Sequence, residues 1–539
     1  MVLLFSFLSY SGIGQTNISS YSGLVTIKSF PQNKQICERQ KSMSTAKVKI
    51  AGAVAASSNY DKIKLWVSTD TVGNFYQTYL NLNYVGDSAS FELDYFLSAN
   101  FHNHKFILTG VNGTEETVEW IVTDVVAGDI YIINGQSNAQ AYLSAMPEDI
   151  VPFTRSFRAN QWNDLQHSFP GRWGAHLANV MSQYLGFPIG IFNFADGAQP
   201  ITYFQKNIDD SLSNYSLMMD RLHNAGLSAP IATFWFHGEA NGWDTSTDTY
   251  VMEYNTLHSS WKDDLGIDAS FLFQVRYKGC AHPNPDIFEA HRLLAEQNSD
   301  IGIMSTTNAD HDSCHYRWED GYKVLAERMA QVVKDELYNQ TVASQDFAPN
   351  MKKIERFNAN TLRITFEPAG VPLSIVGDPS FDFRHEESGH RATSIWTIGD
   401  TLLVQFDTIV NVGEHFSYLC HPGPTPDWVV TSSGVGILEF FNQPIVDFVV
   451  SGSRVLAPKK ELMISPNPSN GIFLLDWNKS EPVDIFVLDG LGQILLQKSE
   501  YAPSGIQLDL SHFPQGIYQV RVQSEKDIRI GTLIKSDKE

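Results

Sequence analysis

Between residues 129 and 337, short apolar segments alternate with amphipathic helical segments. The apolar segments are as long as buried strands, and strands that alternate with helices pack as a parallel sheet covered on both faces. The expected strands are 129–135, 187–195, 229–238, 270–277 and 301–307, and the expected helices are 174–186, 286–298 and 321–337. The middle of the chain is therefore predicted to be an α/β domain with a flavodoxin-like parallel sheet in three α/β/α layers.

The segments on both sides of this region have a different pattern, with short β-type runs separated by turn residues. A chain of 539 residues is also too long for a single core, because cores stop growing at about 250–300 residues. The predicted order is a signal peptide (1–15), a β-sandwich (16–126), the α/β domain (127–340), a β-rich accessory domain (341–450), a linker (451–461) and a small β domain (462–539).

Composition and charge exclude some classes of partner. The chain has 38 basic and 60 acidic residues, a net charge of −22, and so acidic a surface repels nucleic acid and anionic lipid. No stretch approaches the ~20 apolar residues of a membrane span. The first 15 residues resemble an export signal, with Gly12 and Gly14 at a cleavage site before Gln15 but without a basic start, so the true start could lie upstream.

Four polar clusters follow the expected strands, at the sheet edge where α/β proteins bind ligands. They are GQSNAQ (135–140), ADGAQPI (195–201), WFHGEANG (235–242) and ADHDSCHYRWEDGY (309–322). Each also has a structural interpretation: Ser137 could only cap a helix, and Gly197 could only make a tight turn. Asp312 and His315 are spaced so that a carboxylate can orient an imidazole, although this pair alone is a weak signal.

The order of the four clusters resembles the SGNH (GDSL-type) hydrolase superfamily, and within it the sialate O-acetylesterase-like branch. The matching segments are GQSN (135–138), NFADGAQPI (193–201), WFHGEAN (235–241) and DSCHY (312–316), and QICERQ (35–40) is similar to that branch's opening strand. The resemblance implies a serine esterase that needs no cofactor and removes O-acetyl groups from carbohydrates.

The resemblance also implies a role for each matching residue. Ser137 matches the nucleophile, His315 the general base and Asp312 the acid that orients it. The backbone N–H groups of Ser137 and Gly197 match the oxyanion hole. Its third donor in this branch is a Gln, which is His237 here, so that donor would depend on pH with an ionisation near the ordinary His pKa of about 6.5.

The remaining matching positions support these groups. A second glycine of the family's turn is replaced by Ala198. The residues expected to support the site from behind are Gln136, Asn138, Glu239 and Asn241.

Several alternatives remain open. Asp310 is a second candidate for the acid, and His311 is a rival histidine. A metal site would have to gather His282, His291, His311 and His315, whose irregular spacing fits no standard zinc pattern, and we predict no metal. At the level of function, the alternatives are a glycan-binding protein with a weakened oxyanion hole and a lipase-like esterase.

Four cysteines, Cys37, Cys280, Cys314 and Cys420, form no CxxC pair, which argues against a zinc ribbon or a redox motif. In an oxidising compartment disulfides can form. Cys280 and Cys314 are the first pair to test, because both lie on loops expected near the active site. Unpaired thiols are the alternative.

The last segment resembles the type A sorting domain of the type IX secretion system. Three motifs carry this resemblance, ISPNPSNGIF (464–473), VLDGLGQIL (487–495) and SHFPQGIYQVRV (511–522). The alternative is a carbohydrate-binding sandwich. The resemblance implies the type IX secretion machinery as a partner and a protein that passes through the periplasm of a Gram-negative bacterium to its surface or surroundings.

Overall fold

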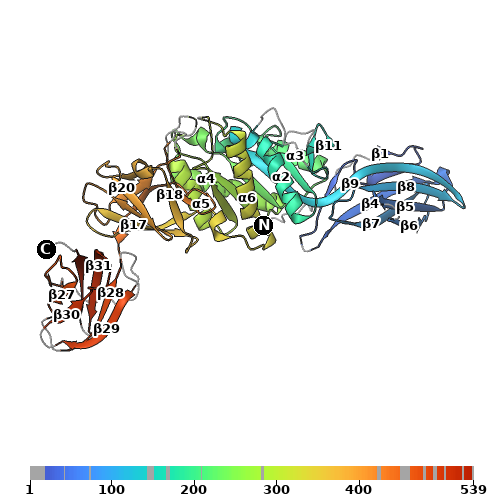
Figure 1. Ribbon diagram of the computed structural model, residues 1–539. Helices are drawn as coiled ribbons and strands as arrows, with labels where there is room; N and C mark the ends of the chain where they lie inside the picture. The colour runs from blue at the N-terminus through green and yellow to red at the C-terminus, as the bar shows by residue number, and fades with distance from the viewer. Residues whose placement is uncertain are drawn as a thin grey trace, which may run out of the picture. The chain divides into compact units, whose positions relative to one another are not determined.

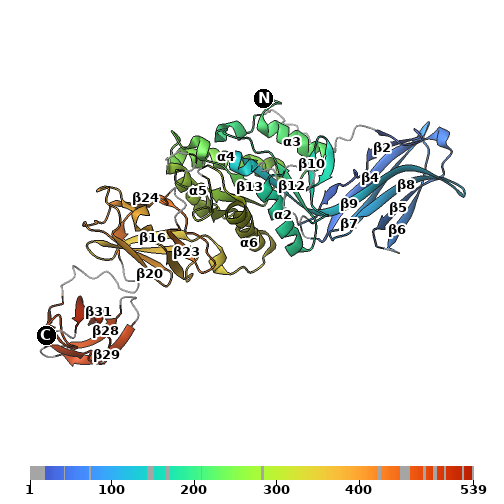
Figure 2. The same cartoon turned by 45° about the horizontal axis from the view of Figure 1, so that its top comes forward.

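The computed structural model describes residues 18–536 except 42, 72–73, 142–150, 166–169, 208, 279, 281–284, 313, 422–425, 449–461, 478–480, 490–493, 503–504 and 525–526. The chain divides into two compact units, Met1–Asp447 and Phe448–Glu539 (Figures 1 and 2). The predicted signal peptide and linker lie outside the described residues.

A parallel sheet forms the middle of the first unit. Its strands stand in the order β12-β9-β13-β14-β15, and each neighbouring pair is parallel. They are β9 (Glu115–Gly135), β12 (Ile189–Asn193), β13 (Ala232–Phe236), β14 (Ala269–Gln274) and β15 (Ile301–Ser305). At one edge, β10 (Arg155–Arg158) pairs with β12, and β11 (Gln161–Asp164) pairs with β10. Every residue of β13 and β14 is buried, as expected for strands covered on both faces.

Helices connect these strands, so the predicted mixed α/β class is confirmed. They are α1 (Ser137–Gln140), α2 (Arg172–Leu185), α3 (Asn214–Asn224), α4 (Thr247–Leu265), α5 (Asp286–Gln297) and α6 (Val324–Tyr338). Helix α2 packs against α6, and α4 packs against α5 (Figure 1). Ser213 and Ser246 cap the first turns of α3 and α4 by accepting a backbone N–H.

Strand β9 belongs to two parts of the first unit. Its first half pairs with β8, whereas its last residues form the centre of the parallel sheet. The predicted domain boundary between residues 126 and 127 falls inside this strand, where β3 (Ile36–Glu38) pairs with it. The two parts are therefore joined by continuous backbone hydrogen bonding.

The N-terminal part contains two sheets around one core. One sheet has β1 (Ile18–Ser19), β2 (Val25–Ser29), β4 (Thr45–Ala55) and β7 (Ser88–Ser98). In the other, β5 (Lys62–Thr69), β6 (Phe75–Asn81) and β8 (His104–Asn112) extend from β9. Buried aliphatic side chains of both sheets, such as Ile50 and Leu65, meet in the core, which explains the alternating pattern of the sequence.

A second β-rich part follows α6 and has its own core. Its five-stranded sheet has β16 (Asn350–Arg356), β17 (Thr361–Glu367), β20 (Ser394–Ile398), β21 (Thr401–Gln405) and β25 (Val446–Asp447). Two smaller sheets have β18 (Leu373–Val376) with β23 (Trp428–Thr431), and β19 (Phe383–His385) with β22 (His415–Tyr418) and β24 (Phe440–Pro444).

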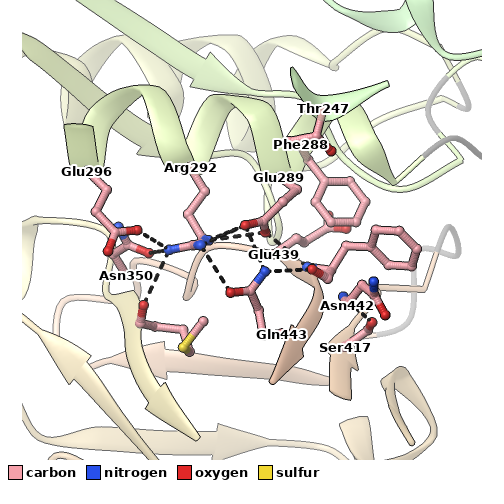
Figure 3. Close-up of polar contacts among 12 residues, drawn as sticks. Thr247, Phe288, Glu289, Arg292, Glu296, Asn350, Ser417, Glu439, Asn442 and Gln443 are labelled. Carbon is pink, nitrogen blue, oxygen red and sulfur yellow. Dashed lines mark hydrogen bonds and ion pairs between the residues drawn. The ribbon is translucent and has the colours of Figure 1, made fainter. Parts of the chain in front are cut away.

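Buried polar contacts tie this part to helix α5 (Figure 3). Glu289 and Arg292 on α5 form an ion pair of 2.6 Å, and both side chains are almost fully buried. Glu289 also accepts the backbone N–H of Phe441 at 3.0 Å and the side-chain amide of Gln443 at 2.9 Å. These donors offset the cost of removing the Glu289 carboxylate from water, so the contacts hold β24 firmly against helix α5.

The second unit contains antiparallel strands only, among its described residues. They are β26 (Ile464–Ser465), β27 (Ile472–Leu475), β28 (Glu481–Leu488), β29 (Ile494–Ala502), β30 (Ile506–Asp509), β31 (Gly516–Gln523) and β32 (Ile528–Lys535). They enclose a core of their own around the buried Trp477. Across the described parts of both units, no helix has the length and apolar character needed to cross a membrane.

Candidate active site

Ser137 follows the carboxyl end of β9, at the first residue of α1. The turn depends on Gly135, whose φ is +125°, because a Cβ at this position would lie 2.4 Å from the carbonyl oxygen of Phe236. The side chain of the buried Gln136 fixes the same turn by accepting the N–H of Ala240 at 3.0 Å. Ser137 itself is half-buried, so its hydroxyl group remains accessible.

Asn138 joins three of the four predicted clusters. Its side-chain amide donates to Glu239 Oε1 at 2.6 Å and to the carbonyl oxygen of Cys314 at 3.1 Å. Its Oδ1 accepts the hydroxyl of Tyr322 at 2.8 Å. Asn138 is fully buried, so these bonds connect the residue after Ser137 rigidly to the cluster after β13 and to the loop that carries His315.

Glu239 is buried beside Asn138, away from solvent. Burial raises the pKa of its carboxyl group, and the hydrogen bond from Asn138 opposes this rise. The group therefore fits the predicted supporting role.

The loop of residues 310–316 carries both Asp312 and His315. The backbone N–H of Asp312 donates to the carbonyl oxygen of His315 at 2.9 Å, and both side chains are exposed. Within the described residues, no hydrogen bond links Ser137 Oγ, the His315 ring and the Asp312 carboxylate. Catalytic hydrogen bonds are often long without substrate and tighten in the complex, so this geometry does not exclude the pair.

A disulfide fastens this loop to the segment after β14. Cys280 and Cys314 are bonded to each other, and this is the pair that the sequence marked as the first to test. Cys37 and Cys420 are buried free thiols. Burial raises the pKa of Cys37 to about 12, which leaves it protonated and unreactive.

The rival residues of the loop have other contacts. The Asp310 carboxylate lies 3.4 Å from the guanidinium of Arg317 and points to it. His311 is buried, with its Nδ1 3.3 Å from the carbonyl oxygen of Ala309. Asp312 therefore has the freer carboxylate for the neighbouring imidazole.

Residues 195–201, here called the oxyanion loop, face Ser137. A Cβ built on Gly197 would lie 4.0 Å from the Cβ of Ser137 and 3.1 Å from Gln140 Oε1, so the two backbones approach closely. The loop is held by Gln140, whose amide donates to Ala195 O at 3.0 Å, and by Asn241, whose Oδ1 accepts the N–H of Ile201 at 2.9 Å. Ala198 has a φ of +59°, a left-handed conformation that costs a residue with a Cβ roughly 1–2 kcal/mol.

His237 differs from its sequence-based expectation. The ring is fully buried, with Nε2 2.9 Å from the carbonyl oxygen of Gln199 and Nδ1 2.9 Å from the hydroxyl of Tyr250. Burial lowers the pKa of His237 to about 3, so the expected ionisation near pH 6.5 is wrong. Both ring nitrogens are engaged inside the protein, which leaves no N–H for an oxyanion.

Within the part of the chain that the structure describes, His291, His311 and His315 do not form a group of possible metal ligands. His291 lies on α5 with its Nε2 3.2 Å from the Tyr250 hydroxyl, and His282 lies outside the described residues. Among the described residues, one group of three could offer metal ligands, with donor atoms within 4.8 Å of one another: Asp382, Cys420 and His421. His421 Nδ1 lies 2.7 Å from Asp382 Oδ2, as in an ordinary hydrogen-bonded pair.

A second set of Ser, His and Asp lies at the amino ends of the strands. His258 Nδ1 is 2.9 Å from Ser270 Oγ, and His258 Nε2 is 3.2 Å from Asp300 Oδ2. Ser270 is completely buried, so no substrate reaches its hydroxyl. Sequence reasoning missed this set, and it also missed Tyr250, Tyr322 and Gln140. The last two stand inside the quoted motifs, whereas Tyr250 has no motif of its own.

Comparison with known proteins decides the class of this site. Residues 127–335 match the family described as "Carbohydrate esterase, sialic acid-specific acetylesterase". The middle of the chain therefore matches a carbohydrate-esterase family. The predicted resemblance and the predicted class of enzyme, a carboxylic ester hydrolase, are confirmed.

One solved structure supports the fold. A carbohydrate acetylesterase from Xanthomonas citri is similar with a TM-score of 0.56 and 17% identity, over 78% of this chain and 100% of that one. A protein from Arabidopsis thaliana matches with a TM-score of 0.32 and 15% identity, over 39% of this chain and 98% of that one, which is too low to support an argument. No curated protein sequence matches this chain.

The C-terminal unit matches a second family. Residues 463–536 correspond to the "Secretion system C-terminal sorting domain", so the predicted sorting domain is confirmed. A domain of this kind implies a protein that is secreted or displayed on the cell surface.

Proposed function

We propose that this carbohydrate esterase removes O-acetyl groups from carbohydrates with Ser137 as nucleophile, His315 as general base and Asp312 as the acid that orients it. The observation that carries the proposal is the bond from Asn138 to the Cys314 carbonyl, because it docks the loop of His315 on the turn that presents Ser137. The His315 ring and the Asp312 carboxylate are exposed, and catalytic hydrogen bonds of this kind tighten when substrate binds.

The reaction proceeds by acyl transfer. His315 takes the proton of Ser137, and the hydroxyl oxygen attacks the acetyl carbonyl. The sugar hydroxyl leaves with the proton from His315, and water then releases acetate from the serine through the same base. The negative oxygen of each tetrahedral intermediate is stabilised by the backbone N–H groups of Ser137 and Gly197.

The oxyanion hole has two donors in this proposal instead of three. His237 uses its Nε2–H on the Gln199 carbonyl, so we assign it no direct contact with the oxyanion. Gln136, Asn138, Glu239 and Asn241 support the site through the bonds described above.

One experiment tests the nucleophile. The protein is incubated with a fluorophosphonate, which phosphonylates an activated serine, and the modified peptide is identified by mass spectrometry. We expect the label on Ser137. We also expect the unlabelled protein to release acetate from p-nitrophenyl acetate and the labelled protein to release none. A label elsewhere, or acetate release that Ser137→Ala retains, would refute the assignment.

A glycan-binding protein is the alternative function, and two observations favour it. Ala198 holds a left-handed conformation in the oxyanion loop, and the triad is not closed by hydrogen bonds among the described residues. Wild-type protein that binds acetylated glycans but releases no acetate would establish this alternative.

We further propose that the sorting unit carries the enzyme across the outer membrane from the periplasm of a Gram-negative bacterium. Residues Phe448–Glu539 form a compact unit with a separate core, which fits an address that is not part of the active site. Deletion of residues 462–539 is expected to leave kcat unchanged and to retain the enzyme in the periplasm. A shortened enzyme that still reached the cell surface would contradict this role.

A further inference from the structure

His237 makes one bond that fixes the protonation of its ring. Its Nε2 lies 2.9 Å from the carbonyl oxygen of Gln199, and a carbonyl oxygen can only accept. Nε2 therefore carries the hydrogen. In a neutral imidazole the other nitrogen is then an acceptor, so the hydroxyl of Tyr250 donates to His237 Nδ1 at 2.9 Å.

Two other groups donate hydrogen bonds to the Tyr250 hydroxyl oxygen, so the hydrogen of this hydroxyl is available for His237 Nδ1. The indole Nε1–H of Trp235 donates at 3.1 Å. His291 accepts the N–H of Val275 at its Nδ1, so its hydrogen is on Nε2, which lies 3.2 Å from the hydroxyl. The Tyr250 hydroxyl also lies 3.2 Å from the backbone carbonyl oxygen of His237, and its shorter contact is the one to the His237 ring. The chain of hydrogen bonds ends at the Gln199 carbonyl.

The chain joins elements that are distant in sequence. Trp235 and His237 stand at the end of β13, Tyr250 lies on α4 and His291 lies on α5. The His237 ring is also stacked on the Trp235 ring, with centroids 4.7 Å apart. Gln199, by contrast, belongs to the oxyanion loop, two residues after Gly197. The chain therefore links that loop to the rigid interior of the domain.

We propose that His237 and Tyr250 are positioning residues that hold the oxyanion loop in the conformation that directs the Gly197 N–H at the reacting oxygen. This inference rests on the proposed roles of Ser137 and Gly197. The loop needs such a support because glycine, at position 197, restricts the backbone little and Ala198 is held in a left-handed conformation. Displacement of a reacting group by about 1 Å is enough to cost roughly 10²-fold in rate.

The role makes a specific demand on the side chain at position 237. It must donate to the Gln199 carbonyl and accept from the Tyr250 hydroxyl. Glutamine offers both, through its amide nitrogen and its amide oxygen, whereas alanine offers neither. The Tyr250 hydroxyl contacts the ring and the backbone carbonyl oxygen of His237, and only the ring bonds to Gln199. Once that ring is removed, the hydroxyl has no remaining hydrogen-bonded link to the Gln199 carbonyl.

The test measures kcat, KM and melting temperature for His237→Gln, His237→Ala, Tyr250→Phe and the double variant His237→Ala/Tyr250→Phe. We expect His237→Gln to keep kcat within about threefold and His237→Ala to lower it roughly 10²-fold with little change in KM. Tyr250→Phe lowers kcat by about tenfold, because the His237 ring still packs on Trp235. The double variant is no slower than His237→Ala.

His258→Ala is the matched control. His258 is a buried histidine on the same helix as Tyr250, and its partners Ser270 and Asp300 lie at the other end of the sheet. We expect it to lower the melting temperature and to leave kcat unchanged. If His237 had a purely structural role, the loss of kcat would follow the loss of stability. His237→Ala and His258→Ala would then lose kcat in proportion to their fall in melting temperature.

A crystal structure of the Ser137 phosphonate adduct gives a direct view. We expect the phosphoryl oxygen to accept from the N–H groups of Ser137 and Gly197 while His237 stays bonded to Gln199. His237 bonded to the phosphoryl oxygen, an unchanged kcat in His237→Ala, or losses that multiply in the double variant would overturn the inference. An inactive wild type, or an active Ser137→Ala, would instead refute the proposed function.

Discussion

Two sets of Ser, His and Asp lie at opposite ends of the same parallel sheet, and they differ in hydrogen bonding and in accessibility. Ser270, His258 and Asp300 form a closed hydrogen-bonded chain, but the hydroxyl is completely buried. Ser137, His315 and Asp312 are not joined by hydrogen bonds among the described residues, but they are accessible and Ser137 faces the oxyanion loop.

The difference shows that a hydrogen-bonded triad is not sufficient for catalysis. The chain through His258 satisfies polar groups that the fold buries, and Thr233 also bonds to Ser270 at 2.6 Å. A catalytic serine needs, in addition, a route for substrate and donors for the developing charge. Parallel α/β sheets bind ligands at the carboxyl ends of their strands, and Ser137 lies there, half-buried and beside the oxyanion loop.

The largest effect is expected from the two serines. Ser137→Ala removes the nucleophile, so we expect kcat to fall by about 10⁴-fold or more, whereas Ser270→Ala leaves kcat unchanged. The measurement is acetate release by each purified variant. Adding His315→Ala to Ser137→Ala is expected to cause almost no further loss, because triad members act as a unit. Comparable losses for the two serines would remove the distinction between the two sets.

The acidic residues of the loop give the next largest effect. Asp312→Asn is expected to lower kcat by about 10²–10⁴-fold, because an amide does not stabilise the imidazolium of His315. Asp310→Asn is the matched control, and it should change kcat only slightly, since the Asp310 carboxylate points to Arg317. The reverse ranking in the same assay would transfer the role to Asp310.

A smaller effect is expected from the disulfide, which only the accessible set possesses. Cys280 and Cys314 are separated by 34 residues, and a cross-link of that span stabilises a fold by about 3–4 kcal/mol in the chain-entropy model. Reduction by dithiothreitol is expected to lower the melting temperature and to lower kcat about tenfold, because His315 is the neighbour of Cys314.

The double variant Cys280→Ser/Cys314→Ser provides the control for reduction. It is expected to have the kcat of the reduced enzyme and to show no response to dithiothreitol. If wild-type activity were the same before and after reduction, the loop of His315 would be held by Asn138 alone.

The smallest effect concerns the stability of the buried set in acid. Burial lowers the pKa of His258, although Asp300 opposes this, so below pH ~6.5 the unfolded chain binds more protons at this residue than the folded protein. The free energy of unfolding therefore falls as the pH falls, by at most about 1.4 kcal/mol per pH unit for one side chain. Urea unfolding between pH 7 and pH 5 is expected to show a shallower fall for His258→Gln than for the wild type. An equal slope would mean that His258 is already protonated in the folded protein.

Much of the fold could be predicted from the sequence, because burial leaves a pattern. All five strands at the centre of the first unit were located from apolar runs, and α2, α5 and α6 from helical spacing. Helix α4 was missed although its buried residues Tyr250, Tyr254 and Trp261 have helical spacing. These side chains are amphipathic, so they do not stand out as an apolar face.

The candidate site was predictable only in part. The motifs marked Ser137, Gly197, Glu239 and Asp312 as candidates, because their order along the chain is distinctive, and the structure places Gly197 close to Ser137. The role of His237 was not predictable, since its partner is the backbone carbonyl of Gln199 and a backbone atom leaves no trace in the residue types. The hydrogen-bonded chain of His258, Ser270 and Asp300 was not predictable either, because its members are scattered over residues 258–300 without a motif.

Strand β9 determines which parts of this protein could be exchanged between proteins during evolution or by engineering. The esterase family match begins at residue 127, inside a strand that runs from Glu115 to Gly135. A transplanted piece beginning at that residue would lose the half of β9 that pairs with β8, together with β3 beside the break. A transplant of the esterase region is therefore expected to need the N-terminal sheets as well, whereas Phe448–Glu539 has a core of its own and is the portable part of the chain.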